Sequence, residues 1–132
     1  MADCHLGGWR DQKMRDLGML AFRKAIDSCI EHEADFALIC GDLFNTAIPG
    51  IEIIKEAMSQ LKRLKQADIP VYIIPGSHDF SPTGKTVLDL LQEADLCTNV
   101  FKGEIVDGKI KLAYTHDKKT GFKLTGILGK RG

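Results

Sequence analysis

Segments with the hydrophobic spacing of helices alternate with short, continuously apolar segments, and this alternation restricts the fold more than any other feature. Between residues 17 and 30, apolar side chains recur every three to four positions, as on one face of an amphipathic helix. Residues 36–40 and 71–74 are unbroken apolar runs that stop at Gly41 and at Pro75-Gly76. Such runs are typical of strands that are buried on both faces of a sheet.

Helical spacing returns after each of these two strands. A second helix is predicted from Pro49-Gly50 to about residue 67, and a shorter one from about residue 86 to residue 94. Strands that alternate with helices in this way are joined by right-handed crossovers and form a largely parallel sheet. The sequence therefore predicts an α/β fold in which helices flank the sheet.

The last third of the chain has the pattern of antiparallel strands. Residues 104–106 and 109–112 flank Asp107-Gly108, which is a strong signal for a two-residue hairpin turn. Residues 122–128 could add one more strand. Because 132 residues with 44% hydrophobic content suit one compact core, residues 1–132 are predicted to form a single domain.

The composition excludes several classes of protein. No apolar run approaches the roughly 20 residues of a membrane-spanning helix, and the N-terminus has no secretory signal, so we expect a cytoplasmic protein without a membrane partner. The eighteen basic and eighteen acidic side chains cancel, so any attraction to DNA must be local. The four cysteines form no Cys-x-x-Cys pair, and Cys29 and Cys40 lie in apolar segments as buried free thiols usually do.

Side chains that can bind metal ions follow the predicted strands where these strands end. Asp42 follows the first strand, His78 and Asp79 follow the second, and Asp3 and His5 open the chain. In open α/β sheets, functional groups collect at the carboxyl ends of the strands. We therefore expect these side chains to converge at one edge of the sheet.

The types of these side chains favour a transition-metal site. Alternation along an extended segment would place Asp3 and His5 on the same side, as a chelating pair. Carboxylate and imidazole together suit Mn²⁺, Fe²⁺ or Zn²⁺ better than Ca²⁺, which prefers oxygen alone. Gly41 and Gly76 permit tight turns that would direct the following side chains into a shared cavity. Each motif alone is common in ordinary turns, so the hypothesis depends on their combination and order.

The three motifs, in this order, resemble the opening signature of calcineurin-like metallophosphoesterases. They are Asp3-Cys4-His5, Gly41-Asp42-Leu43-Phe44-Asn45 and Gly76-Ser77-His78-Asp79. The flanking Leu6-Gly7 and Leu43-Phe44 look like those of the Mre11/SbcD DNA repair nucleases, in particular the archaeal ones, and the resemblance extends to about residue 106. It implies an α-β-β-α sandwich whose second half is incomplete in this chain.

The resemblance also implies roles for individual residues. Asp3 and His5 would hold one metal ion, and Asp42 would bridge it to a second ion held by Ser77. His78 would be the catalytic residue, acting on the scissile phosphate or the leaving group as a general acid or as a transition-state stabiliser. Asn45 and Asp79 would support the site, although Asn45 could equally be a turn-stabilising asparagine.

The implied activity is hydrolysis of DNA ends with two divalent metal ions, here expected to be Mn²⁺. The implied partners are DNA, a Rad50-like ATPase and a second copy of the chain in a homodimer.

The sequence departs from the family pattern in several places. Asn45 stands where many relatives have aspartate or histidine. Ser77 stands where the family usually has asparagine, and its hydroxyl is a shorter and weaker ligand. The later histidine and the Gly-His-x-His segment that complete the family site are absent, and His32 and His116 have the context of surface histidines. The strand that should precede Asp3 is absent as well. We therefore expect a chain truncated at both ends that binds metal weakly.

Two alternatives to a DNA nuclease remain open. The same metal core serves metallophosphoesterases that act on small phosphodiesters or phosphoproteins. A catalytically incomplete fragment could instead act as a scaffold or dimerisation element through its helices.

Overall fold

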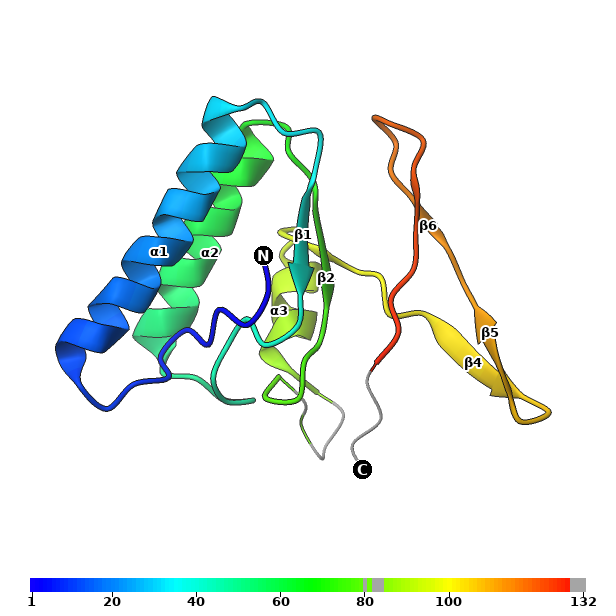
Figure 1. Cartoon of the computed structure of the whole chain (residues 1–132), viewed down its shortest axis with the longest axis horizontal. Helices are drawn as coiled ribbons and strands as arrows, with labels where there is room; N and C mark the ends of the chain where they lie inside the picture. Colours follow the sequence, from blue (N-terminus) through cyan, green and yellow to red (C-terminus); the bar gives the residue numbers. More distant parts are fainter. Residues whose placement is uncertain (80, 82–84, 129–132) are drawn as a thin grey trace.

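The computed structural model describes residues 1–79, 81 and 85–128 of the chain. A three-stranded parallel sheet in the order β1-β2-β3 lies between two long helices and two antiparallel hairpins (Figure 1). The helices α1 and α2 cover one side of the sheet, and α3 packs against β3. The predicted α/β fold with a parallel sheet is confirmed. None of the helices in the described ranges is long and apolar enough to span a membrane.

The three predicted helices are present, and local caps set their ends. Helix α1 spans Gln12–Glu31, α2 spans Ile51–Gln66 and α3 spans Val87–Glu93. The first helix begins five residues before the predicted start because Asp11 caps it, accepting a hydrogen bond from the Met14 N–H at 3.1 Å. The apolar stripe could not mark this polar first turn. A capping box of Thr86 and Asp89 begins α3.

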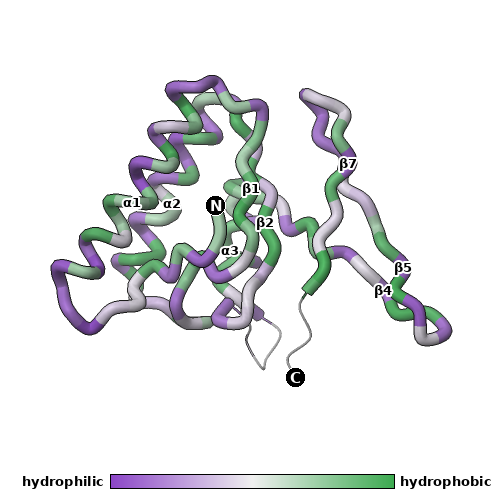
Figure 2. The backbone as a smooth tube through the Cα atoms, in the orientation of Figure 1, coloured by the Kyte–Doolittle hydropathy of each residue, from purple (hydrophilic) through white to green (hydrophobic). Residues whose placement is uncertain are grey.

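The helices α1 and α2 lie side by side and bury their apolar faces on the sheet. Ile26 of α1 and Leu61 and Leu64 of α2 have no exposed surface, and neither has Ile73 of the sheet. Two ion pairs also join the helices, one of which links Arg63 Nη2 to Asp27 Oδ1 at 2.6 Å. Figure 2 shows β1 and β2 as a mostly hydrophobic centre, whereas hydrophobic and hydrophilic residues alternate along α1 and α2. The core therefore lies between the helices and the sheet.

The sheet consists of β1 (Ala37–Cys40), β2 (Val71–Ile74) and the two-residue β3 (Thr98–Asn99), which the sequence did not reveal. Strand β2 is central and buried as predicted, but the prediction that β1 is buried on both faces is wrong. Leu38 pairs with Tyr72 in the register, yet Leu38 is 39% exposed and Tyr72 only 6%. The segment around Asp117 covers β2 and leaves this face of β1 open.

The same open face corrects the prediction for the cysteines. Cys40, at the end of β1, is exposed, and Cys29 is half-buried. Cys97 is buried, and burial raises the pKa of its thiol to about 12. All four cysteines are free thiols.

Two hairpins follow the sheet. Strands β4 (Gly103–Val106) and β5 (Lys109–Leu112) pair through Asp107 and Gly108, whose φ angles of 51° and 72° suit a tight hairpin turn, so this prediction is confirmed. The strand predicted at 122–128 is only β7 (Lys123–Leu124), which pairs with β6 (Thr115–His116).

A buried hydrogen bond fixes the second hairpin to the sheet. The Tyr72 hydroxyl donates to Asp117 Oδ1 at 2.6 Å. Burial, together with the adjacent carboxylate, raises the pKa of Tyr72 to about 12. Hydrogen bonds from Tyr72 and Thr120 hold the pKa of Asp117 below its usual range. The pair therefore joins residues that lie 45 positions apart in the sequence.

Candidate metal centre

The loops after β1 and β2 meet at the carboxyl edge of the sheet, where two glycines allow them to approach. Gly41 has a φ of +87°, and a side chain there would come within 3.3 Å of the Gly76 Cα. A Cβ on Gly76 would collide with the backbone nitrogen and the carboxylate of Asp42. The close approach of the two loops therefore requires glycine at both positions.

Asp79 holds the two loops together from inside. Its side chain is only 2% exposed. One carboxylate oxygen accepts the N–H of Phe44 at 3.1 Å, and the other accepts those of Leu43 at 3.2 Å and Gly76 at 3.0 Å. Charge-assisted hydrogen bonds of this kind are stronger than those between neutral groups. The predicted supporting residue thus joins the loop that carries Asp42 to the loop that carries His78.

The N-terminal segment forms the third side of the site by pairing with β1 and the loop after it. Met1 hydrogen-bonds to Leu38 and Cys40, and Leu6 forms a parallel bridge with Phe44. Between these points, the His5 N–H donates to the Asp42 carbonyl at 2.9 Å. This pairing brings the start of the chain to the candidate centre.

The candidate ligands have an unusual backbone conformation in common. In the described ranges, seven non-glycine residues have positive φ: Asp3, His5, Glu33, Asp42, Asp68, Asp95 and Asp107. Three of them directly follow the C-caps of α1, α2 and α3, where a left-handed residue often ends a helix, and a fourth is in the hairpin turn. The remaining three are Asp3, His5 and Asp42, with φ of 51°, 44° and 47°. Such conformations gather at functional sites.

The prediction that Asp3 and His5 alternate along an extended segment is wrong. Asp3 and His5 do not alternate along a regular extended segment, because both adopt left-handed conformations. Their side chains nevertheless meet, with His5 Nε2 3.9 Å from Asp3 Oδ1. The left-handed residues, and not strand alternation, bring the pair together.

Asp3, His5 and Asp42 each offer a ligand atom, and all three atoms lie within 4.8 Å of one another. In the described part of the chain, no other group of three or more His, Cys, Asp or Glu has this geometry. Ligand atoms that share one cation at about 2.1 Å are at most about 4.2 Å apart, so only a small side-chain movement is needed. His5 Nδ1 is buried without a hydrogen-bond partner, as is consistent with an imidazole whose nitrogen is available to bind a metal ion. The donor set suits a first-row divalent cation.

Ser77 and His78 lie against Asp42 from the other loop. The His78 N–H donates to Asp42 Oδ1 at 2.7 Å, and the Ser77 hydroxyl is 3.5 Å from Asp42 Oδ2. Both side chains are exposed. Ser77 is thus next to Asp42, the carboxylate that the family resemblance implies is shared by two metal ions.

The orientation of His78 is fixed by a backbone carbonyl. His78 Nδ1 lies 2.7 Å from the carbonyl oxygen of Asn45, and because a carbonyl can only accept, Nδ1 carries the proton. The imidazole also packs edge-on against His5, with ring centroids 4.8 Å apart. In the neutral ring, Nε2 is therefore the basic nitrogen. No sequence pattern marks this contact, since any residue at position 45 has a carbonyl.

The other two histidines are far from this centre, as expected for surface histidines. His32 caps the C-terminal end of α1 and is exposed. His116 is exposed on β6 and lines a cavity at the opposite end of the sheet. Neither adds a ligand to the group of Asp3, His5 and Asp42.

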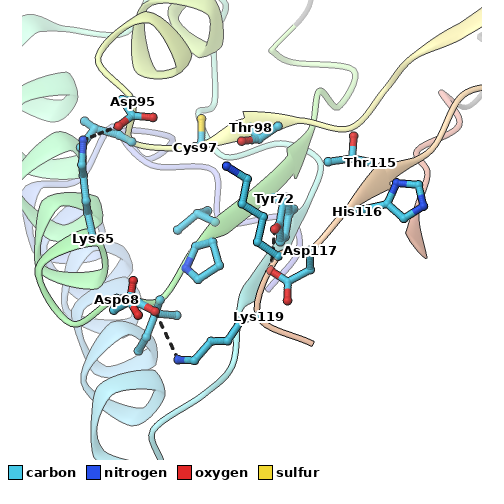
Figure 3. A pocket seen from close by; sticks show the side chains of 15 residues that line it. Lys65, Asp68, Tyr72, Asp95, Cys97, Thr98, Thr115, His116, Asp117 and Lys119 are labelled. Carbon is cyan, nitrogen blue, oxygen red and sulfur yellow. Dashed lines mark hydrogen bonds and ion pairs between the residues drawn. The ribbon is translucent and has the colours of Figure 1, made fainter. Parts of the chain in front are cut away.

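That cavity, of about 610 Å³, is separate from the candidate centre. Figure 3 shows this cavity, with Tyr72 and Asp117 among the residues that line it. Val71, the first residue of β2, also lines it, whereas Asp42 follows the carboxyl end of β1. Three of the charged groups around it have partners, since Lys65 Nζ is 2.6 Å from Asp95 Oδ2 and Asp117 binds Tyr72. We therefore assign the chemistry to the carboxyl edge of the sheet and not to this cavity.

Comparison with known proteins identifies the family to which the chain is similar. Residues 1–128 match the family model of the calcineurin-like phosphoesterases. The chain is 40% identical over 125 residues to the DNA double-strand break repair protein Mre11 of Methanococcus maripaludis, covering 84% of this chain and 33% of that protein. It is 31% identical over 119 residues to Mre11 of Archaeoglobus fulgidus, covering 81% of this chain and 26% of that protein.

A third relative, Mre11 of Saccharolobus solfataricus, is 33% identical over 119 residues, covering 82% of this chain and 30% of that protein. The chain thus spans between a quarter and a third of the length of these curated relatives. The match over nearly all of its residues shows that the chain belongs to the calcineurin-like phosphoesterase family.

Proposed function

We propose that residues 1–132 form one domain, the N-terminal part of a nuclease that hydrolyses phosphodiester bonds at DNA ends during double-strand break repair. The observation that carries this proposal is the group of Asp3, His5 and Asp42, whose ligand atoms lie within 4.8 Å of one another. The similarity to Mre11 proteins over more than four fifths of the chain supports DNA as the substrate. No observation favours the alternatives, a phosphoesterase for small substrates or a scaffold, over this function.

Two divalent cations, expected to be Mn²⁺, would be held at this centre. In the proposed arrangement Asp3 and His5 would hold the first ion, Ser77 would help to hold the second, and Asp42 would be shared by both. Such ions would neutralise charge on the phosphodiester and lower the pKa of a water molecule for in-line attack. The Ser77 hydroxyl lies 3.5 Å from Asp42 Oδ2, which supports its place near a shared ion.

His78 is the proposed catalytic residue. Its Nδ1 proton is committed to the Asn45 carbonyl at 2.7 Å, so Nε2 is the atom that would carry a proton to the leaving oxygen. Asn45 acts through its backbone in this assignment, and Asp79 acts by holding the loops together. Both are positioning residues.

Three partners belong to the same proposal: DNA, a Rad50-like ATPase and a second copy of the chain. The similarity to Mre11 proteins supports the first two. Because a repair nuclease must meet the chromosome, a cytoplasmic location is proposed with them.

The metal centre is tested by calorimetric titration of the chain with Mn²⁺. We expect weak binding that Asp42→Asn lowers at least tenfold, while Asp35→Asn, an exposed aspartate away from the centre, leaves it unchanged. Two tight Mn²⁺ sites would contradict the expected weakness of a centre with so few ligands. Equal affinity in Asp42→Asn and the parent would exclude this centre.

The substrate is tested separately. Reading the coding frame beyond both ends for the missing histidine and the Gly-His-x-His segment determines whether the native protein completes the site. If those segments are there, the protein that contains them should degrade duplex ends in Mn²⁺, and the 132-residue chain should do so poorly. Hydrolysis of nitrophenyl phosphodiesters without any action on DNA would instead support the small-substrate alternative.

A further inference from the structure

Trp9, the only tryptophan in the chain, is 57% exposed. Tryptophan has a large apolar ring and is highly buried in most folded proteins. An exposed tryptophan ring offers a large, rigid surface on which a partner can bind. The neighbouring Arg10 is also exposed.

The backbone on both sides of Trp9 is fixed. On one side, the Gly8 N–H donates to the His5 carbonyl at 2.9 Å. On the other side, Asp11 caps helix α1 through the Met14 N–H. Only a short link separates these anchors, so the exposed ring is carried by a restrained backbone and not by a free loop.

The same link borders the candidate metal centre. A Cβ on Gly8 would lie 2.9 Å from Asn45 Oδ1, so Gly8 is in close contact with Asn45. The carbonyl of Asn45 in turn holds His78 at 2.7 Å. Consecutive Cα atoms are about 3.8 Å apart, so the Cα of Trp9 is one such step from Gly8, which contacts Asn45 beside the centre.

We propose that Trp9 is a stacking platform for an unpaired base of the DNA strand whose phosphodiester occupies the candidate metal centre. Stacking on an exposed aromatic ring tolerates any base, because every base has a π-face. Arg10 next to it can pair with a backbone phosphate of the same strand. The placement of the strand rests on the proposed function, whereas the stacking itself does not require metal.

The test uses the fluorescence of this single tryptophan in the 132-residue chain. The chain is titrated in EDTA with a single-stranded oligothymidylate, and in parallel with an abasic strand of equal length that carries the same phosphates. We expect saturable quenching by the oligothymidylate and little by the abasic strand. Equal quenching by the two strands, or none by either, would overturn the proposal.

Variants supply the second arm, in which the anisotropy of a dye-labelled oligothymidylate reports binding. Trp9→Ala should weaken binding at least fivefold, since base stacking is worth about that factor or more, and Trp9→Phe should retain most of the affinity. Tyr114→Ala, at an aromatic side chain that is 54% exposed on the hairpin segment, is the matched control and should bind as the parent does. Circular dichroism verifies that each variant is folded. Unchanged affinity in Trp9→Ala would refute the stacking role.

The two proposals can fail independently. Mn²⁺ titration of Trp9→Ala should match the parent, because Trp9 is not among the grouped metal ligands. Quenching by bases in a protein that never cleaves DNA would refute the nuclease and leave the stacking residue standing. Cleavage of DNA that is unaffected by Trp9→Ala, with no quenching, would refute only the stacking residue.

Discussion

Replacing Asp79 should weaken both the folding of the two loops and metal binding at the centre beside them. Its carboxylate is 2% exposed and accepts three backbone N–H groups, those of Leu43, Phe44 and Gly76. An asparagine has a single acceptor oxygen, which could serve Leu43 and Gly76 or Phe44, but not all three. Asp79→Asn therefore loses at least one hydrogen bond to a charged group and opposes an amide NH₂ to a backbone N–H.

The size of the effect follows from these bonds. A hydrogen bond to a charged group contributes about 1.5–3 kcal/mol, so Asp79→Asn should lower the free energy of unfolding by about 2–3 kcal/mol. Asp79→Ala, which leaves three N–H groups without an acceptor, should lower it by about 4 kcal/mol or more. Because domains of this size have only about 5–15 kcal/mol in total, the alanine variant is expected to be close to unfolding.

Urea denaturation followed by circular dichroism at 25 °C measures these differences. Asp35→Asn, an exposed aspartate, is the control and should change stability by less than about 0.5 kcal/mol. Mn²⁺ affinity should also fall in Asp79→Asn, although Asp79 is not among the grouped ligands. The reason is that the loop carrying Asp42 loses hydrogen bonds that hold it in place. If the free energy of unfolding of Asp79→Asn lies within about 0.5 kcal/mol of the parent value, the carboxylate does not hold the loops together.

Three further outcomes are expected. Gly76→Ala should abolish Mn²⁺ binding and lower stability by several kcal/mol, because its Cβ would collide with Asp42. Gly18→Ala, where a Cβ in α1 meets no other atom, should raise stability by about 0.5–1 kcal/mol through helix propensity. Similar melting curves for the two variants would contradict this. The pKa of Tyr72 is raised to about 12 in the folded protein, so folding favours the protonated phenol. The stabilisation from this group is complete below pH about 10 and is lost as the pH rises toward 12. Tyr72→Phe should abolish this part of the alkaline loss of stability, measured by urea denaturation. Iodoacetamide at pH 8 should alkylate the exposed Cys40 and spare Cys97, whose pKa burial raises to about 12; peptide mass spectrometry showing the reverse order would contradict the assigned burial.

Much of the fold could be predicted because its signals are local. Hydrophobic spacing identified the helices and the strands β1 and β2, and Asp107-Gly108 identified the hairpin, since each pattern depends on neighbours within a few residues. The motifs at the strand ends also predicted that Asp3, His5 and Asp42 would meet, because parallel strands end at the same edge of a sheet. The two-residue β3 was too short to leave such a pattern.

Other features were decided only by the tertiary structure. Leu38 and Cys40 are exposed although their run is as apolar as β2, because burial of the second face depends on which distant segment covers it. The carboxylate of Asp79 binds backbone groups 35 and 36 positions away, and Tyr72 finds Asp117 45 positions away. Backbone N–H groups and carbonyls are the same in every residue, so no side-chain pattern marks which of them a buried carboxylate or imidazole will reach. The sequence therefore determined which elements form and which candidate metal ligands meet, while packing between distant segments decided which faces are covered and how the loops are held.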